Sequence, residues 1–237
     1  MKKSSLKSHL WKWRDSFESL ALPRTVFRVV VLGSGGVGKT SLITRFTSDE
    51  FTEDYNPTVE DLYETPLNLT PKITAVFDIV DTAGSYNFPA MRKLTVDEGD
   101  AFILVYSVED ESSLHEVLKI RSEIIEAKGT NSVPMILVAN KCDIPEEDRQ
   151  LTAEKISETL IKAGVDCLSI AASARYGFNV IATFKALLAE IAFGHEGFLP
   201  NKSENAVSRK RDRLPAHVST SPLDWLKSHV LGAKTRS

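Results

Sequence analysis

A glycine-rich segment between a hydrophobic run and a helical pattern constrains this chain more than any other feature. Its spacing, G-x-x-x-x-G-K-[ST], turns backbone amides inward so that they can surround the phosphates of a nucleotide. Residues 26–32 before it predict a buried strand, and residues 39–46 predict a helix whose positive N-terminal end faces the anion. The residues of this cradle are Gly33, Ser34, Gly35, Gly36, Val37, Gly38, Lys39, Thr40 and Ser41. A chance glycine-rich turn is the alternative, but it would not require the lysine, the hydroxyl and the strand together.

Lys39 and Thr40 supply the chemistry that this cradle needs. The glycines let the backbone adopt positive φ angles and approach the phosphates closely. Lys39 can neutralise charge on the β- and γ-phosphates, and the hydroxyl of Thr40 can be a ligand of Mg²⁺. We therefore expect Mg²⁺ as the cofactor and Lys39 among the catalytic residues. The cradle alone does not distinguish ATP from GTP.

A second motif, Asn140-Lys141-Cys142-Asp143, distinguishes the two bases. It follows the hydrophobic run 133–139, so we expect it at the carboxyl end of a strand, where open parallel sheets bind ligands. The carboxylate of Asp143 can accept hydrogen bonds from N1 and N2 of guanine, whereas adenine has no donors there and would leave the acid unpaired. We therefore expect GTP and GDP as ligands, bound by Asn140, Lys141 and Asp143.

A third motif, Asp81-Thr82-Ala83-Gly84, ends the apolar run 73–80. Its position predicts the Asp81 carboxylate near Mg²⁺, bound through a water, and the amide of Gly84 near the γ-phosphate, where Gly84 joins the catalytic set. A D-x-x-G sequence alone is common by chance. Three motifs in this order and at these spacings are very rarely found together by chance.

Together the three motifs resemble those of the Ras superfamily of small GTPases, over a domain from about residue 24 to residue 193. The resemblance implies that residues 55–63, Tyr-Asn-Pro-Thr-Val-Glu-Asp-Leu-Tyr, form the first switch. It also implies that Thr58 ligates Mg²⁺ through its hydroxyl, senses the γ-phosphate through its amide and is one of the catalytic residues. By the same likeness, Phe51 would pack against the base and Tyr55 would close over the phosphates.

The segment Ser173-Ala174-Arg175 is similar to the last guanine motif of that superfamily, in which the amide at the alanine position meets the base oxygen. Residues 171 and 172 are alanines where other members often have polar residues. Between Asp143 and Ser173 there is no room for the extra helix of Rho proteins, and the chain lacks the terminal cysteines typical of Rab proteins. The Ras branch therefore fits best.

Residues 88–92 and 101–107 look most like the Di-Ras subgroup of that branch. One position differs from much of the superfamily: Ser85 follows D-x-x-G where many members have a glutamine that orients the attacking water, and Di-Ras proteins share this serine. Hydrolysis of GTP depends on positioning that water, and a serine is too short to reach it. We therefore predict slow intrinsic hydrolysis with Ser85 at the catalytic position, unless Tyr86 or Asn87 compensates.

The resemblance also implies protein partners. No arginine finger can be recognised in the sequence, so efficient switching would need a GTPase-activating protein, and we expect an exchange factor and effectors as well. The leading hypothesis is a monomeric signalling GTPase that is mostly loaded with GTP. Two alternatives stay open here: a GTP-loaded binding scaffold whose hydrolysis has no regulatory use, and an ATP-dependent P-loop kinase.

Residues 59–80 predict two strands joined at 68–71, the first of them an antiparallel edge strand. Edge strands can accept partners, and the resemblance implies that this edge pairs with effector domains. The predicted effector region consists of Tyr55, Pro57, Thr58, Val59, Glu60, Asp61 and Tyr63. A solvated edge protected by its charges is the alternative.

Length and composition agree with one domain and two arms. The 237 residues, 42% of them hydrophobic, permit one α/β domain with a good core. Apolar runs alternate with helical patterns, one of them capped by Thr152, so we predict a mostly parallel sheet with crossover helices. The expected fold is a P-loop NTPase domain with six strands, one antiparallel edge strand and helices on both faces. The expected boundaries are 1–23 for an N-terminal arm, 24–193 for the GTPase domain, and 194–237 for a tail with a short helix at 222–231.

Charge is unevenly distributed along the chain. Residues 1–24 hold six basic and two acidic side chains and residues 200–237 hold eight and three, so the arms carry +9 and the body −12 of the overall −3. Each arm could meet an anionic membrane or fold back onto the acidic body. No recognition motif accompanies the charge, so we expect no nucleic-acid partner. The hydrophobic positions of the first arm have the spacing of an amphipathic helix, with packing on the domain and disorder as alternatives: Leu6, Leu10, Trp13, Phe17 and Leu20.

The sequence also bears on location. It shows no secretory signal, no stretch long enough to span a bilayer, no terminal cysteine and no glycine after Met1, and Cys142 and Cys167 are too few for a disulfide framework. We therefore expect an intracellular, cytoplasmic protein with no lipid anchor, whose contact with the plasma membrane would be electrostatic and reversible. The basic cluster at 209–213 leaves a nuclear location open, and a solvated tail is the alternative.

Overall fold

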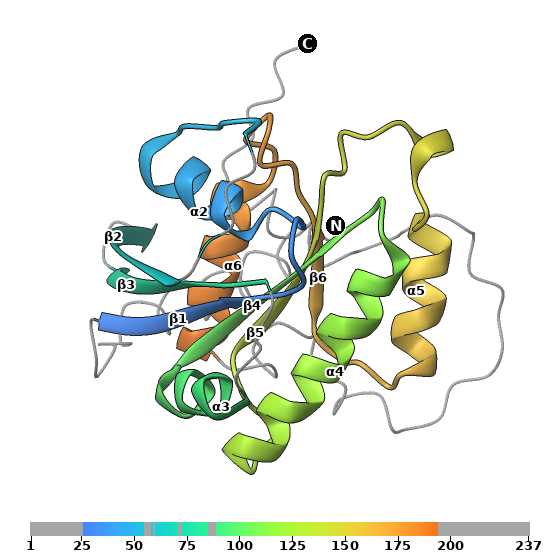
Figure 1. The fold of residues 1–237 in the computed structure, drawn as a ribbon. Helices are drawn as coiled ribbons and strands as arrows, with labels where there is room; N and C mark the ends of the chain where they lie inside the picture. The colour runs from blue at the N-terminus through green and yellow to red at the C-terminus, as the bar shows by residue number, and fades with distance from the viewer. Residues whose placement is uncertain (1–25, 55–57, 59, 71–72, 85–88, 194–237) are drawn as a thin grey trace, which may run out of the picture.

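The computed structural model describes residues 26–54, 58, 60–70, 73–84 and 89–193 (Figure 1). Its strands are β1 (Val26–Leu32), β2 (Glu60–Thr70), β3 (Ile73–Thr82), β4 (Ala101–Ser107), β5 (Met135–Asn140) and β6 (Leu168–Ala171). Its helices are α2 (Lys39–Ser48), α3 (Pro89–Glu98), α4 (Glu111–Lys128), α5 (Ala153–Lys162) and α6 (Val180–Phe193), with a short 3₁₀ turn η1 (Glu146–Asp148). Both predicted arms, and the proposed helix at 222–231, lie outside the described residues.

The strands form one six-stranded sheet in the order β2-β3-β1-β4-β5-β6. All neighbouring pairs are parallel except β2 and β3, which are antiparallel. The predicted fold class is therefore confirmed, including the antiparallel strand at one edge. The predicted turn at 68–71 was misplaced by a few residues, because β2 runs on to Thr70 and β3 begins at Ile73.

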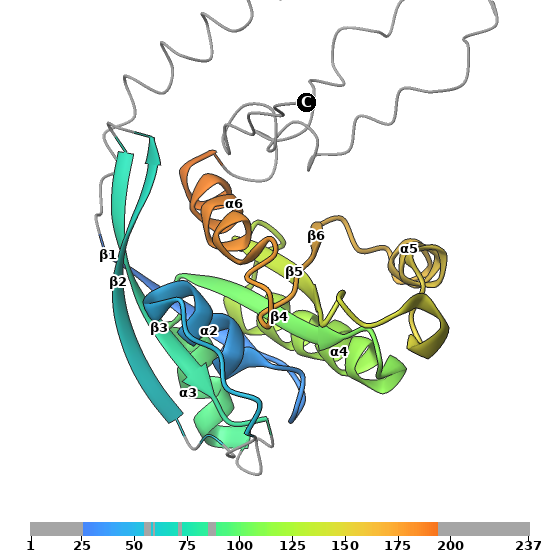
Figure 2. The same cartoon turned by 90° about the horizontal axis from the view of Figure 1, so that it is seen from above.

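Both faces of the sheet are buried, which explains why its central strands have continuous apolar sequences. In β1, Val29 and Val31 belong to a core cluster with side chains of α2 and α6, whereas Val30 and Leu32 belong to a cluster with α3 and α4. Figure 2 shows these helices in two layers with the sheet between them. Phe184 of α6 stacks on Phe46 of α2, with ring centroids 3.8 Å apart, and so fixes these two helices side by side.

Helix ends follow the sequence signals. Asp110 caps α4 by accepting a hydrogen bond from the amide of Ser112, and Gly129 ends this helix with a φ of 65°. Thr152 caps α5 by accepting from the amide of Lys155, as predicted. No helix among the described residues has the length and apolar character needed to cross a lipid bilayer.

Candidate functional site

A pocket of about 500 Å³ opens at the carboxyl ends of the parallel strands. Its walls come from the segments that follow β1, β3, β4, β5 and β6. In the sheet, β1 lies between β3 on one side and β4 on the other, so the pocket lies at the point where the strand order reverses. Open α/β sheets bind ligands at this point.

Glycines shape the loop between β1 and α2 where no side chain would fit. A methyl group on Gly33 would lie 2.1 Å from the carbonyl oxygen of Val105, and Gly33 also has a φ of 147°. Gly38, just before α2, has a φ of 91°, and a methyl group there would lie 2.4 Å from Nδ2 of Asn140. The loop can therefore pass this close to β4 and β5 only with glycine at both positions.

Lys39 is held inside this loop. Its ammonium donates hydrogen bonds to the carbonyl oxygens of Gly33 (3.0 Å) and Ser34 (2.9 Å), and the residue is only 6% exposed. Burial lowers the pKa of Lys39 to about 8, although the nearby carboxylate of Asp81 acts in the opposite direction. The cradle therefore holds a cation that bound phosphates would stabilise.

The carboxylate of Asp81 is the group that indicates a metal site. Its side chain is fully buried at the end of β3, and neither carboxylate oxygen has a hydrogen-bond partner of ordinary geometry among the described residues. Burial raises the pKa of Asp81, while the nearby Thr40 hydroxyl and Lys39 ammonium favour its charged form. A buried, unpaired carboxylate is costly unless a cation is bound beside it.

Two hydroxyls complete a donor set that suits Mg²⁺. Oγ1 of Thr40 and Oγ1 of Thr58 lie 2.7 Å apart and share a hydrogen bond, although they come from α2 and from the segment before β2. The described part of the chain contains no cluster of three or more histidine, cysteine or acidic side chains that could hold a metal. A cation here would therefore depend on phosphate oxygens of a nucleotide, as is usual for Mg²⁺. The residues present fit that ion.

Gly84 brings the D-x-x-G segment against the cradle. A methyl group at Gly84 would lie 2.2 Å from Cα and 2.4 Å from the backbone nitrogen of Gly35. The two segments thus meet backbone to backbone, and both line the pocket. This contact places the amides of both segments at the same end of the pocket.

Asn140 joins the cradle to the last motif. Its Nδ2 donates to the carbonyl oxygen of Val37 (2.8 Å), and its Oδ1 accepts from the amide of Ala174 (3.2 Å). The side chain is almost completely buried, so both bonds are shielded from water. Three loops distant in sequence are held together by one carboxamide.

The remaining walls of the pocket come from segments outside the cradle. They include Phe51, Asp143, Ala174 and Arg175. Lys141 has a left-handed backbone with a φ of 63°, and its ammonium forms an ion pair with the carboxylate of Glu109, in the segment after β4. An aromatic ring, a carboxylate and a fixed lysine around one cavity can accommodate a purine base.

The Ras family model matches residues 28–193 of this chain, a span that covers most of it and all the motifs above. The chain belongs to the Ras family. Guanine nucleotides and Mg²⁺ are therefore its ligands and GTPase activity its reaction, as general properties of that family. Family membership also removes the ATP-dependent kinase from the alternatives. The match identifies the family and not the subgroup.

The structure of this Ras-family protein brings most of the predicted site residues to one pocket. Pocket-lining residues among those predicted are Gly35, Gly36, Gly38, Lys39, Thr40, Ser41, Phe51, Thr58, Gly84, Asn140, Lys141, Asp143, Ala174 and Arg175. Ser173 is buried beside the pocket and pairs with Phe178 in an isolated β-bridge. Tyr55, Pro57, Val59 and Ser85 lie outside the described residues, so their roles stay predictions.

Sequence reasoning missed two residues of the pocket region, Arg45 and Glu109. Glu109 is a carboxylate two positions after a buried strand, a location that could have drawn attention to it. Arg45 gives no such signal, because its partners in the last motif are about 130 residues away in the sequence. Only the folded chain shows what Arg45 contacts.

Proposed function

We propose that this Ras-family protein is a signalling switch of the Di-Ras type that hydrolyses GTP slowly and is mostly loaded with GTP. The observation that carries this proposal is Ser85, which directly follows D-x-x-G. Catalysis of GTP hydrolysis rests on positioning the attacking water and stabilising charge, so a short hydroxyl in place of a long amide removes one positioning group.

The rest of the pocket would bind and orient the nucleotide. Lys39 and the cradle amides hold the phosphates, while Thr40, Thr58 and Asp81 are the residues that would hold Mg²⁺, the last through a water. Bound Mg²⁺ neutralises charge on the β- and γ-phosphates. The assembled pocket supports tight nucleotide binding, while the step that would be impaired is the placement of water next to Gly84.

Single-turnover hydrolysis tests the proposal. We expect Ser85→Gln to hydrolyse bound GTP on the order of tenfold faster than wild type, because the longer amide can reach the water. Ser85→Ala is the matched control and should stay near the wild-type rate. A Ser85→Gln variant that hydrolyses GTP no faster than wild type would contradict the proposal. It would favour the alternative that Tyr86 or Asn87 compensates for the missing glutamine.

A GTP-loaded scaffold without regulatory hydrolysis is the second candidate, and Ser85 favours it equally. The two differ in whether another protein accelerates hydrolysis, since a switch needs an activating protein and a scaffold does not. Hydrolysis measured with and without cell extract separates them. A rate that no extract changes would favour the scaffold.

A further inference from the structure

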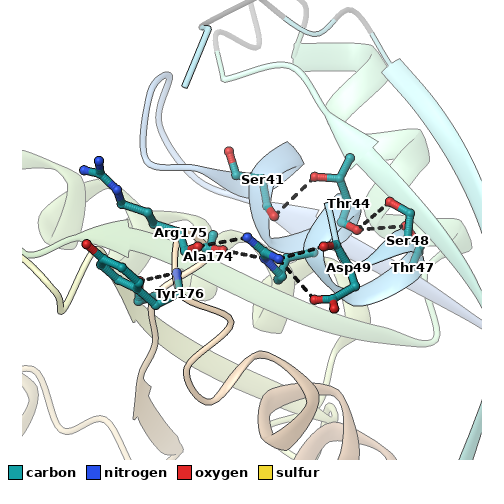
Figure 3. Close-up of polar contacts among 10 residues, drawn as sticks. Ser41, Thr44, Thr47, Ser48, Asp49, Ala174, Arg175 and Tyr176 are labelled. Carbon is teal, nitrogen blue, oxygen red and sulfur yellow. Dashed lines mark hydrogen bonds and ion pairs between the residues drawn. The ribbon is translucent and has the colours of Figure 1, made fainter. Parts of the chain in front are cut away.

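Arg45 connects two walls of the pocket that are far apart in the sequence. Its side chain projects from α2 and is only 18% exposed. Nε donates to the carbonyl oxygen of Ala174 (2.9 Å) and one terminal nitrogen donates to that of Arg175 (2.8 Å). The other terminal nitrogen donates to the carbonyl oxygen (2.7 Å) and to the carboxylate (3.1 Å) of Asp49. In Figure 3 these hydrogen bonds are dashed lines that lead from the guanidinium to the labelled Asp49 and to the labelled Ala174 and Arg175.

The loop at Ala174 is thereby held from two directions. On one side its amide donates to Asn140, and on the other its carbonyl accepts from Arg45. Gly177, with a φ of 68°, turns the chain back over the arginine, so that a methyl group there would lie 3.6 Å from Cδ of Arg45. A carbonyl hydrogen-bonded to a guanidinium has little freedom to swing away from the pocket.

The segment after α2 is tied to the same arginine. Asp49 ends this helix with a φ of 58° and accepts two of the four hydrogen bonds. The Arg45 guanidinium also lies 5.9 Å from the centre of the Phe51 ring, which lines the pocket. An exposed ion pair between Arg175 and Glu53 (2.6 Å) joins the two segments a second time, but such pairs contribute little.

We propose that Arg45 is a positioning residue that sets the rate at which bound guanine nucleotide leaves. A nucleotide enclosed between the segments at 49–54 and 173–176 can leave from this end only if they separate. While the arginine bridges them, separation breaks several charge-assisted hydrogen bonds. Arg45 makes no hydrogen bond to the cradle, to Thr58 or to Asp81 in the described structure, so it acts on release and not on the chemical step.

Arginine is suited to this role in a way that lysine is not. Its planar fork directs donors to several acceptors at once, and here three nitrogens serve four oxygens. A lysine retains the charge but presents a single nitrogen, so it cannot bridge the same set of carbonyls. Arg45→Lys therefore separates the effect of the bridge from the effect of the charge.

The test is the release of a fluorescent GDP analogue from the full chain, chased with excess GDP at fixed Mg²⁺. We expect release to be about tenfold faster from Arg45→Ala and at least threefold faster from Arg45→Lys, with association changed much less. Lys162→Ala, which removes an exposed ion pair on α5, is the control and should release at the wild-type rate. Release from Arg45→Lys within twofold of wild type would overturn the proposal, even if Arg45→Ala fails to fold.

Two further measurements identify which end of the pocket is affected. Chelation of Mg²⁺ weakens binding at the phosphate end of the pocket. The ratio of release rates between Arg45→Lys and wild type should therefore persist in the presence of chelator. A ratio that falls to one would contradict a role of Arg45 at the base end. Single-turnover GTP hydrolysis by loaded Arg45→Lys should match wild type, and a parallel loss would contradict a role in release alone. The inference rests on guanine-nucleotide binding and not on slow hydrolysis, so a Ser85→Gln result cannot change it.

Discussion

At the scale of single residues, Lys39 and Asp81 show how burial prepares this pocket for its ligands. Each is an ionisable group whose charged form is disfavoured by desolvation and stabilised by the other. Phosphates and a divalent cation would supply the missing opposite charges. Part of the affinity for nucleotide and Mg²⁺ therefore comes from Lys39 and Asp81, whose charges are poorly solvated before the ligands bind.

This arrangement predicts that nucleotide affinity falls as the pH rises above about 8. The free protein then holds a neutral Lys39, since burial lowers the pKa of that lysine to about 8, whereas bound phosphates favour the ammonium. Binding must therefore take up a proton, and one proton weakens affinity by up to about tenfold per pH unit. Below that pH the lysine is already charged, so its contribution is constant.

The measurement is GDP affinity, from association and release rates, between pH 7 and pH 9.5 at constant free Mg²⁺. Lys39→Arg is the control, because a guanidinium stays charged throughout this range. Its affinity should show a flatter dependence on pH than that of wild type, whatever its absolute value. Identical slopes for the two proteins would rule out Lys39 as the titrating group.

The sequence predicted residues whose chemistry is local and missed those whose role is tertiary. Gly33, Lys39 and Asn140 were found because a spacing in one segment already implies a strand end and a phosphate or base contact. Glu109 and Arg45 contact groups in other segments, through an ion pair and through backbone carbonyls. Backbone carbonyls have no sequence signature, so contacts of this kind cannot be read before the chain is folded.

At the scale of elements, β2 is the strand whose position and surface support a docking role. It forms one edge of the sheet and presents the acidic residues Glu60 and Asp61 and the hydrophobic Leu62, which is 61% exposed. The sequence predicted this edge because residues 59–80 indicate two strands joined by turn residues at 68–71. Its exact end depended on pairing with β3 as far as Thr70, which local turn signals could not reveal.

We expect Leu62→Lys to weaken GTP-dependent binding of effectors by about tenfold, since exposed hydrophobic anchors often dominate such interfaces. Ile161→Lys on α5 is the matched control, because Ile161 is 75% exposed on the helix that precedes β6, the strand at the opposite edge of the sheet from β2. Proteins retained from cell extract by the GTP-loaded but not the GDP-loaded chain provide the measurement. Equal retention by both variants would show that β2 is an ordinary solvated edge.

At the scale of the whole molecule, charge is divided between two basic ends and an acidic body. The two ends carry +9 and the rest of the chain −12. Hydropathy and motif spacing predicted the fold class, because the strands and helices that form the core follow from periodic sequence patterns. What the two arms contact does not follow from any such pattern, since their positive charge would suit an anionic membrane as well as the acidic domain.

A vesicle-binding experiment distinguishes these two destinations. If the first arm meets membranes, the full chain should bind vesicles containing an anionic lipid at low salt and be released as salt shortens the screening length to about 3 Å at 1 M. Removal of residues 1–22 should abolish that binding, while removal of residues 222–237 serves as the comparison. Binding unchanged by the first deletion would exclude the arm as the membrane contact.

The contact between Gly84 and Gly35 has a consequence for how such a protein can diversify. Because a methyl group on Gly84 would meet the backbone of Gly35, position 84 offers no side chain that natural variation could enlarge or recharge. Divergence in the timing of the switch must therefore accumulate at neighbouring positions. Residue 85 is the first of these, and in this chain it holds a serine.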